Sequence, residues 1–243
     1  MMTVIGIDYS MNSVGICVYR NKKYEFYSVL NTYSLTSSTK EDIHNNYYNH
    51  CSDDIKKTFL SLDDIELYTR KPNSLNLKKT HKSDKNNELN KWHRKTLVDS
   101  NHLSNTVIGL LIRKGLFNGD TKFVIENYIT NRNGGDTTIQ IIEFTKSFKD
   151  RLFEKVKLNN IFIVTAPEIK MLAGSGNYTK SNMFDAFINE KIDSKFIDYC
   201  KSNKKYLKVG SKDVKKPIDD VIDGYYLTKW YLEKMKKEKL SIF

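Results

Sequence analysis

Val4-Ile5-Gly6-Ile7-Asp8 opens the chain as a short apolar segment that ends in a carboxylate, and the small and polar run Tyr9-Ser10-Met11-Asn12-Ser13 follows it. Apolar, β-branched segments that end at turn-forming residues are typical of buried strands. An ionised carboxylate at the end of a buried strand is costly unless it is paired, and a divalent cation is a natural partner. We therefore expect a buried first strand over residues 3 to 8, with Asp8 as a candidate metal ligand.

Three further carboxylates extend this pattern. Glu126 ends a second apolar segment, and Asp220 and Asp223 open a C-terminal amphipathic segment. Asp220 and Asp223 are three residues apart and would share one face of a helix. Asp219 and Asp223 are four residues apart and could do the same. Acidic residues are also common in a first helical turn for electrostatic reasons alone. Together, the two strand carboxylates and the helical pair offer enough oxygen ligands for two Mg²⁺ or Mn²⁺ ions roughly 4 Å apart, as in-line phosphodiester hydrolysis requires.

The order of the predicted elements indicates the fold class. The predicted strands cover residues 3–8, 14–19, 23–29, 122–127 and 160–165. The predicted helices cover residues 97–116 and 137–155, a short piece that starts on Pro167, residues 180–192, and a last helix from Pro217 or Asp219 to about Lys237. Strands that alternate with helices after an antiparallel start favour a mixed α/β sheet with helices on both faces. We expect a single domain over residues 1–243.

Residues 31 to 96 form a predicted insertion that is basic and partly mobile. This region is rich in Asn, Ser and Lys and lacks clear periodicity, with short helical pieces expected between residues 40 and 62. Nine basic residues lie within Arg70–Lys95, which carries +7 of the net charge of +11. Such a basic excess is typical of proteins that bind a phosphate backbone, although an AT-rich genome also inflates Lys and Asn. We expect Lys78, Lys79 and Lys82 to contact DNA without sequence preference.

Other classes of protein are disfavoured by the composition. No apolar run approaches the roughly 20 residues of a membrane span, and the N-terminus lacks a signal-peptide pattern. The three cysteines fit neither a disulfide framework nor a zinc site, and the five histidines show no metal-ligand spacing. We expect a cytoplasmic protein with no membrane partner.

Four stretches of the chain resemble the RuvC-type Holliday junction resolvases of the RNase H-like superfamily. They are Ile5-Gly6-Ile7-Asp8 with Ser10 to Gly15, Val124-Ile125-Glu126 with Asn127 to Ile129, Ala166 to Lys170 with Gly174-Ser175-Gly176 and Thr179-Lys180, and Pro217 to Gly224. The resemblance covers residues 1–30 and 97–235 and leaves residues 31–96 unmatched.

The resemblance implies an RNase H-like fold and a metal-dependent endonuclease that resolves four-way junctions in branched DNA. It implies catalytic metal ligands at Asp8, Glu126, Asp220 and Asp223, with two Mg²⁺ or Mn²⁺ per site, and DNA phosphates held by Lys170 and Lys180. Ile129 stands where the family has a stacking aromatic, so Tyr128 beside it is the candidate DNA contact. Tyr9 stands where the family often has proline. The Lys-, Asn- and Ile-rich composition and the insertion would suit a phage or other viral protein, acting in its host's cytoplasm.

Several alternatives stay open at this point. An RNase H-fold nuclease could act instead on forks, flaps or RNA–DNA hybrids, and a DNA-binding module could keep the fold without cleaving. Sugar kinases and actin-like ATPases also begin with Gly-x-Asp, but 243 residues barely accommodate their two lobes. A two-fold symmetric junction favours a homodimer. We expect its interface on the helix over residues 137–155, with Phe144 and Phe148 exposed.

Overall fold

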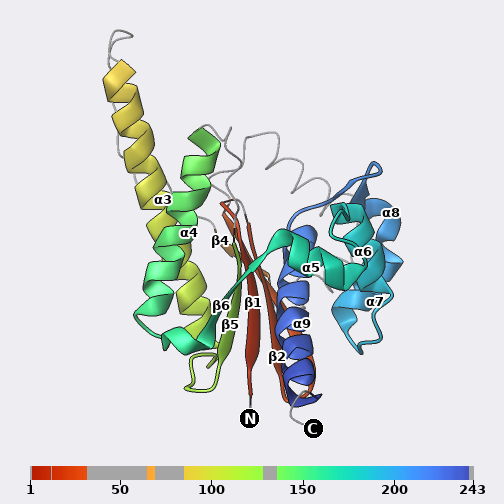
Figure 1. The fold of residues 1–243 in the computed structure, drawn as a ribbon. Helices are drawn as coiled ribbons and strands as arrows, with labels where there is room; N and C mark the ends of the chain where they lie inside the picture. The colour runs from red at the N-terminus through yellow and green to blue at the C-terminus, as the bar shows by residue number, and fades with distance from the viewer. Residues whose placement is uncertain (1, 12, 32–64, 69–84, 128–135, 241–243) are drawn as a thin grey trace.

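The computed structural model describes residues 2–11, 13–31, 65–68, 85–127 and 136–240 (Figure 1). Four of the predicted DNA contacts lie outside the described residues, namely Tyr128, Lys78, Lys79 and Lys82. The helical pieces expected between residues 40 and 62 lie outside them as well.

A mixed six-stranded sheet forms the centre of the structure (Figure 1). Its strands are β1 (Val4–Tyr9), β2 (Ser13–Arg20), β3 (Lys23–Asn31), β4 (Ile65–Tyr68), β5 (Lys122–Asn127) and β6 (Ile161–Thr165). The spatial order is β4-β3-β2-β1-β5-β6, with β2 antiparallel to both of its neighbours and all other neighbours parallel. The order β3-β2-β1-β5-β6 with an antiparallel β2 is the RNase H-like arrangement, and β4 extends it at the β3 edge. The predicted fold class is confirmed.

A tight turn closes the hairpin between β2 and β3. Asn21 and Lys22 have φ values of 54° and 63°, and Arg20 pairs with Lys23. A two-residue loop with positive φ at both positions matches the right-handed twist of the strands that it joins. The local sequence therefore sets the register of this antiparallel pair.

Helices cover both faces of the sheet. They are α3 (Lys85–Arg113), α4 (Asp136–Phe153), α5 (Ala166–Ala173), α6 (Lys180–Ile188), α7 (Lys195–Ser202), α8 (Lys204–Leu207) and α9 (Ile218–Leu240). A short 3₁₀ turn, Leu158–Asn160, precedes β6, and a small hairpin, β7 (Lys208–Val209) with β8 (Asp213–Val214), precedes α9. Helices α3 and α4 lie on one face, and α9 with α5 to α8 lies on the other (Figure 1).

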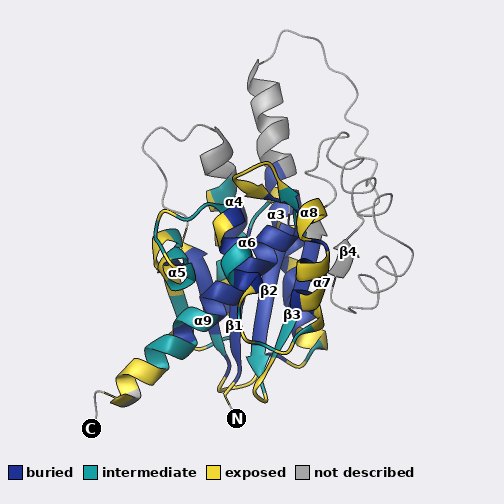
Figure 2. Ribbon diagram, turned by 90° about the vertical axis from the view of Figure 1, so that its right-hand side faces the viewer, coloured by how far each residue is buried: buried dark blue, intermediate teal, exposed yellow. Residues whose placement is uncertain are grey.

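The alternation of side chains along β1 divides the core into two layers. Ile5 and Ile7 belong to the cluster packed with α3 and α4, whereas Val4 belongs to the cluster packed with α6, α7 and α9. All six residues of β1 are buried because helices cover both faces of the sheet. In Figure 2, β1, β2 and the part of α9 over them are coloured as buried, and exposure rises toward the C-terminal end of α9.

The prediction that Phe144 and Phe148 of helix α4 are exposed for a dimer interface is wrong. Phe144 and Phe148 are buried rather than exposed, and the Phe148 ring stacks on Tyr9 with 4.5 Å between ring centroids. Within residues 141–153 of this helix, the exposed apolar residues are Ile142 and Phe153. The apolar face of α4 is part of the hydrophobic core, because the helix packs this face against α3 and the sheet.

Helix α3 begins twelve residues earlier than the predicted start at Leu97. Residues 85–96 are mostly polar, so they lack the apolar periodicity from which the start was predicted. Part of the predicted irregular insertion is therefore helical. Strand β4, which pairs in parallel with β3, also lies within that region and was not predicted.

Candidate active site

The period of the strands brings Asp8 and Glu126 to the same face of the sheet. β1 and β5 are parallel neighbours, and Ile7 pairs with Ile125, so the two carboxylates follow at matching positions. Successive side chains point to opposite faces of a strand. Because Val4 and Val124 both belong to the α9 side of the core, Asp8 and Glu126, which have the same parity, project toward α9.

Two glycines allow α9 to lie directly on the strands. An ideal Cβ on Gly6 would come within 2.1 Å of the carbonyl oxygen of Gly224, and one on Gly15 within 2.0 Å of the carbonyl oxygen of Asp220. Any side chain at these positions would push α9 away from β1 and β2. The first turns of α9, which carry Asp223, therefore approach the strand carboxylates closely.

Thr228 stabilises the packing of α9 on β1 and β2 through buried hydrogen bonds. Its Oγ1 accepts a hydrogen bond from the backbone N–H of Gly6 at 2.9 Å and lies 3.0 Å from the carbonyl oxygen of Cys17, to which it donates. The hydroxyl thus joins β1, β2 and α9 in one place. Buried polar groups that find partners in this way define a single packing arrangement.

Three carboxylates meet at this end of the sheet. Asp8, Glu126 and Asp223 each offer an oxygen, and the three oxygens lie within 4.8 Å of one another. Asp8 and Glu126 are buried, and Asp223 is partly buried. Burial and the neighbouring charge of Asp8 raise the pKa of Glu126 to about 8. Burial and the charge of Glu126 raise the pKa of Asp223 well above its ordinary value.

The donor chemistry of the group fits a hard divalent cation. Like charges this close disfavour ionisation, so full ionisation of all three carboxylates needs a compensating positive charge. Mg²⁺ and Mn²⁺ are bound by carboxylate oxygens. The three carboxylates can therefore hold such a cation.

Asp220, the fourth predicted ligand, lies beside this group and is not one of its three members. Its Oδ1 accepts from the Lys216 ammonium at 2.6 Å, and its Oδ2 accepts from the Ser13 hydroxyl. Burial raises the pKa of Asp220 to about 6, although the nearby Lys216 lowers it. The side chain connects the start of β2 to the start of α9.

Asp219, next to Asp220 in the first turn of α9, is also buried. Its carboxylate accepts from the Lys180 ammonium, and Lys216 Nζ lies 3.7 Å from its Oδ2. Its Oδ1 has no hydrogen-bond partner among the described residues. Sequence reasoning missed Lys216 and Ser13, although Lys216 stands four positions before Asp220, within reach of a side-chain pair.

The two predicted phosphate-binding lysines lie near the carboxylates. Lys170 is partly buried on α5, and Lys180 begins α6. The positive charges of both lysines lower the pKa of Glu126 against the larger effect of burial. Burial lowers the pKa of Lys180, but the charges of Asp219 and Asp220 and its bond to Asp219 outweigh this and raise it overall.

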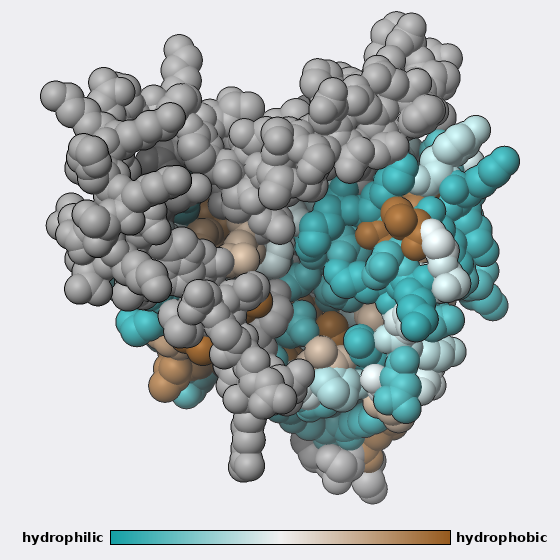
Figure 3. Space-filling model, turned by 90° about the horizontal axis from the view of Figure 1, so that it is seen from above, coloured by the Kyte–Doolittle hydropathy of each residue, from teal (hydrophilic) through white to brown (hydrophobic). Residues whose placement is uncertain are grey.

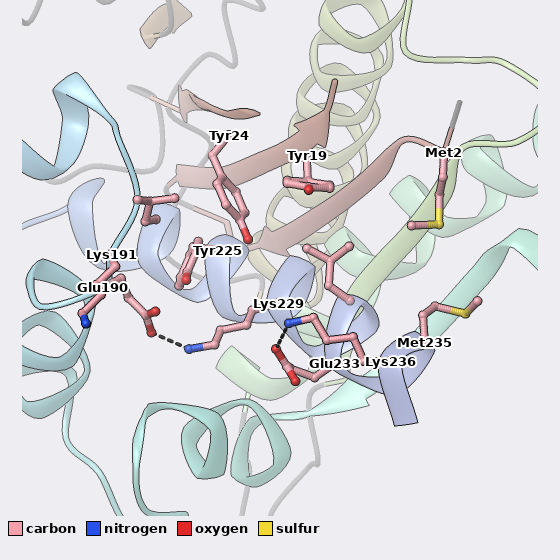
Figure 4. Close-up of a pocket in the computed structure, with 12 residues that line it drawn as sticks. Met2, Tyr19, Tyr24, Glu190, Lys191, Tyr225, Lys229, Glu233, Met235 and Lys236 are labelled. Carbon is pink, nitrogen blue, oxygen red and sulfur yellow. Dashed lines mark hydrogen bonds and ion pairs between the residues drawn. The ribbon is translucent and has the colours of Figure 1, made fainter. Parts of the chain in front are cut away.

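A separate cavity of about 410 Å³ lies near the end of the sheet where β1 begins (Figure 4). Its walls include the aromatic side chains of Tyr19, Tyr24 and Tyr225, and none of the three clustered carboxylates lines it. Figure 4 shows Lys229 and Lys236 pointing at Glu190 and Glu233, and these ion pairs measure 2.5 and 2.7 Å. The charged groups drawn with dashed lines thus neutralise each other.

Comparison with known proteins gives structural likenesses only. No protein-family model matches the chain, and no curated protein matches its sequence. Among solved structures, the chain is similar to Thermus thermophilus RuvC, with 12% identity, 96% of each chain covered and a TM-score of 0.44. It is also similar to T. thermophilus RuvC in complex with a Holliday junction substrate, with 8% identity, the same coverage and a TM-score of 0.44. Among the described helices, none is both long and apolar enough to span a membrane.

Proposed function

We propose that this protein is a divalent-metal-dependent endonuclease that cleaves branched DNA, with the four-way junction as its substrate. The observation that carries the proposal is the meeting of Asp8, Glu126 and Asp223, whose oxygens lie within 4.8 Å of one another. The three residues come from β1, β5 and α9, so the fold as a whole assembles the site. The resemblance of the surrounding motifs to RuvC-type resolvases supports the choice of substrate.

The carboxylates would hold two Mg²⁺ or Mn²⁺ ions. Asp220 is the candidate fourth ligand, because its charge interacts with that of Asp8 although Ser13 and Lys216 hold its oxygens in this structure. When bound, the cations supply Lewis-acid activation of water and stabilisation of the leaving 3′ oxygen, which yields 5′-phosphate and 3′-hydroxyl ends.

Lysines of the site would hold the phosphate. Lys180 is 40% exposed in its side chain while its ammonium is paired with buried Asp219. That pairing orients the ammonium beside the carboxylates, where it meets the negative charge of an entering phosphodiester. Lys170 on α5 would add a second positive charge from the neighbouring helix.

A homodimer belongs to the same proposal. Paired nicks in a two-fold symmetric junction need two active sites related by a two-fold axis. The interface does not use Phe144 and Phe148 of α4, because both side chains lie in the core.

The test compares cleavage of a four-way junction with a linear duplex, a fork, a flap and an RNA–DNA hybrid of the same sequence. We expect Mg²⁺-dependent cleavage of the junction and no cleavage in EDTA. Asp8→Asn, Glu126→Gln and Asp223→Asn should each abolish cleavage and leave junction binding nearly intact, because the amides keep volume but remove the charge that holds the cations.

Three outcomes would contradict parts of the proposal. Full activity in any of the three amide variants would remove the assigned metal site. A preference for forks, flaps or hybrids would keep the nuclease and change its substrate. Tight junction binding with no cleavage in either Mg²⁺ or Mn²⁺ would make the protein a DNA-binding module instead.

A further inference from the structure

Residues 195–216, between α6 and α9, form a second basic region that the sequence pattern did not single out. They contain eight lysines and two aspartates, a net charge of +6 within 22 residues. They fold as α7, α8 and the β7–β8 hairpin. This region therefore carries more than half of the net charge of +11 on a described part of the structure.

Most apolar side chains of the region lie in the core, which fixes the region to the rest of the domain. Phe196, Ile197, Leu207 and Val214 are buried in the cluster beneath α9. Two of the lysines, Lys204 and Lys208, bind Asp185 of α6 at 3.0 and 2.8 Å and fasten the region to the domain core. The backbone positions of the remaining lysines are therefore set by packing.

Four lysines of the region are exposed and have no acidic partner among the described residues. They are Lys195, at the start of α7, and Lys201, Lys205 and Lys212, and no ion pair between described residues includes any of them. Lysine side chains held on a rigid backbone and not neutralised internally attract polyanions. We call Lys201, Lys205 and Lys212 the outer lysines.

Of the outer lysines, Lys212 lies beside the carboxylate site. The carbonyl oxygen of Lys212 accepts from the backbone N–H of Ser181 at 3.0 Å, and the preceding residue, Lys180, binds Asp219. At the other end of the hairpin, Lys216 binds Asp220. Figure 1 shows α8 and the hairpin at the end of the molecule where α9 begins, and Figure 3 shows that the described surface on this side is mainly hydrophilic.

We propose that the outer lysines form a nucleic-acid-binding surface that holds the phosphate backbone of a DNA arm leading away from the carboxylate site. The inference rests on the proposed function, because the DNA cleaved at the carboxylates would lie next to the hairpin that carries Lys212. Tyr206, next to Lys205, is 51% exposed and offers a ring for an unstacked base. Basic side chains interleaved with an exposed aromatic favour nucleic acid over a lipid surface or an acidic peptide.

The experiment compares a triple variant of the outer lysines with a charge-matched control. The test variant is Lys201→Ala, Lys205→Ala and Lys212→Ala. The control replaces exposed lysines at the opposite end of the sheet, with the changes Lys155→Ala, Lys157→Ala and Lys237→Ala. Both variants lose the same charge, so a general loss of attraction affects them equally.

Binding of a labelled four-way junction and a linear duplex is measured by fluorescence anisotropy in EDTA from low to high salt. We expect the test variant to bind both DNAs more weakly and to lower the slope of log affinity against log salt by about two to three units, because each lost phosphate contact removes about one released counterion. The control should keep the wild-type slope, and both variants should keep the wild-type melting temperature.

Several results would overturn the inference. An unchanged slope in the test variant, or an equal fall in the control, would show that the outer lysines do not contact DNA. Binding of anionic phospholipid vesicles or of a poly-glutamate peptide that depends on these lysines, with DNA binding unaffected, would assign the surface to another partner. A wild-type protein that binds DNA through these lysines but never cleaves it would refute the proposed function alone. Cleavage by a test variant whose salt slope is unchanged would refute this inference alone.

Discussion

Gly15→Ala is the substitution that most directly tests how the fold assembles the site. Gly15 pairs with Asp8 in the β1–β2 ladder and lies beneath the start of α9. A Cβ there would be 2.0 Å from the carbonyl oxygen of Asp220, and ordinary contact begins at 3.4 Å. The added methyl group therefore requires a backbone movement of about 1.4 Å, because the atoms that it meets are main-chain atoms that cannot rotate away.

The expected effects follow from that displacement. Overpacking of a tight contact costs about 1–3 kcal/mol of unfolding free energy. In a chain of this size, each kcal/mol lowers the melting temperature by about 2–4 °C. Movement of α9 also carries Asp223 away from Asp8 and Glu126, and a misplacement of about 1 Å can reduce a catalysed rate about 100-fold. Thermal unfolding in EDTA and junction cleavage in Mg²⁺ measure the two effects separately.

Gly119→Ala is the matched control, because a Cβ at Gly119 would meet no atom within 4 Å. Its unfolding free energy should stay within about 0.5 kcal/mol of wild type. If Gly15→Ala has the melting temperature and cleavage rate of wild type, α9 does not depend on the glycine contact, and our account of how Asp223 reaches the strand carboxylates is wrong. If Gly15→Ala lowers the melting temperature but cleaves at the wild-type rate, the glycine contact contributes to stability and does not determine the position of Asp223.

Three further predictions concern the hydrogen bonds, the cation and the assembly. Thr228→Val should lower the unfolding free energy in urea by about 1–3 kcal/mol, because it leaves the buried N–H of Gly6 without its acceptor, whereas Thr228→Ser should restore most of the loss. Mg²⁺ at one hundred times its dissociation constant should stabilise wild type by about 2.7 kcal/mol and Glu126→Gln by much less, and equal thermal shifts in the two proteins would exclude Glu126 as a ligand. Light scattering of the wild-type protein, with and without a four-way junction, should give the mass of a dimer or of a dimer–junction complex, and a strictly monomeric species at micromolar concentration would contradict the two-fold arrangement.

Local patterns in the sequence were sufficient for much of the fold. The apolar run before Asp8 and the one before Glu126 predicted two buried strands, and the structure has β1 and β5 at those places. Ala166–Pro167 predicted a helix start, which is where α5 begins with Thr165 as its N-cap. These features depend on neighbouring residues, through turn chemistry, capping and the period of apolar side chains.

The sequence did not show which partner the apolar face of each helix packs against. Phe144 and Phe148 formed an apolar stripe, and a stripe has the same spacing whether it meets the core or a second subunit. In the sequence, the lysines of residues 195–216 show no regular pattern. The elements that carry them, α7, α8, β7 and β8, are too short to show a clear period of apolar residues. Only packing against the core shows which of these lysines hold Asp185 and which point outward.

For the candidate site, too, one part could be predicted from the sequence and the other part depends on tertiary packing. The sequence determined which carboxylates end strands and which share a face of the last helix, since both follow from the period of a single element. Only the tertiary structure brought Asp8, Glu126 and Asp223 within 4.8 Å and gave Asp220 to Ser13, a residue 207 positions away. The physical reason is that these contacts form when α9 settles on Gly6 and Gly15, and the distance between elements far apart in the chain is decided by packing, which no local pattern encodes.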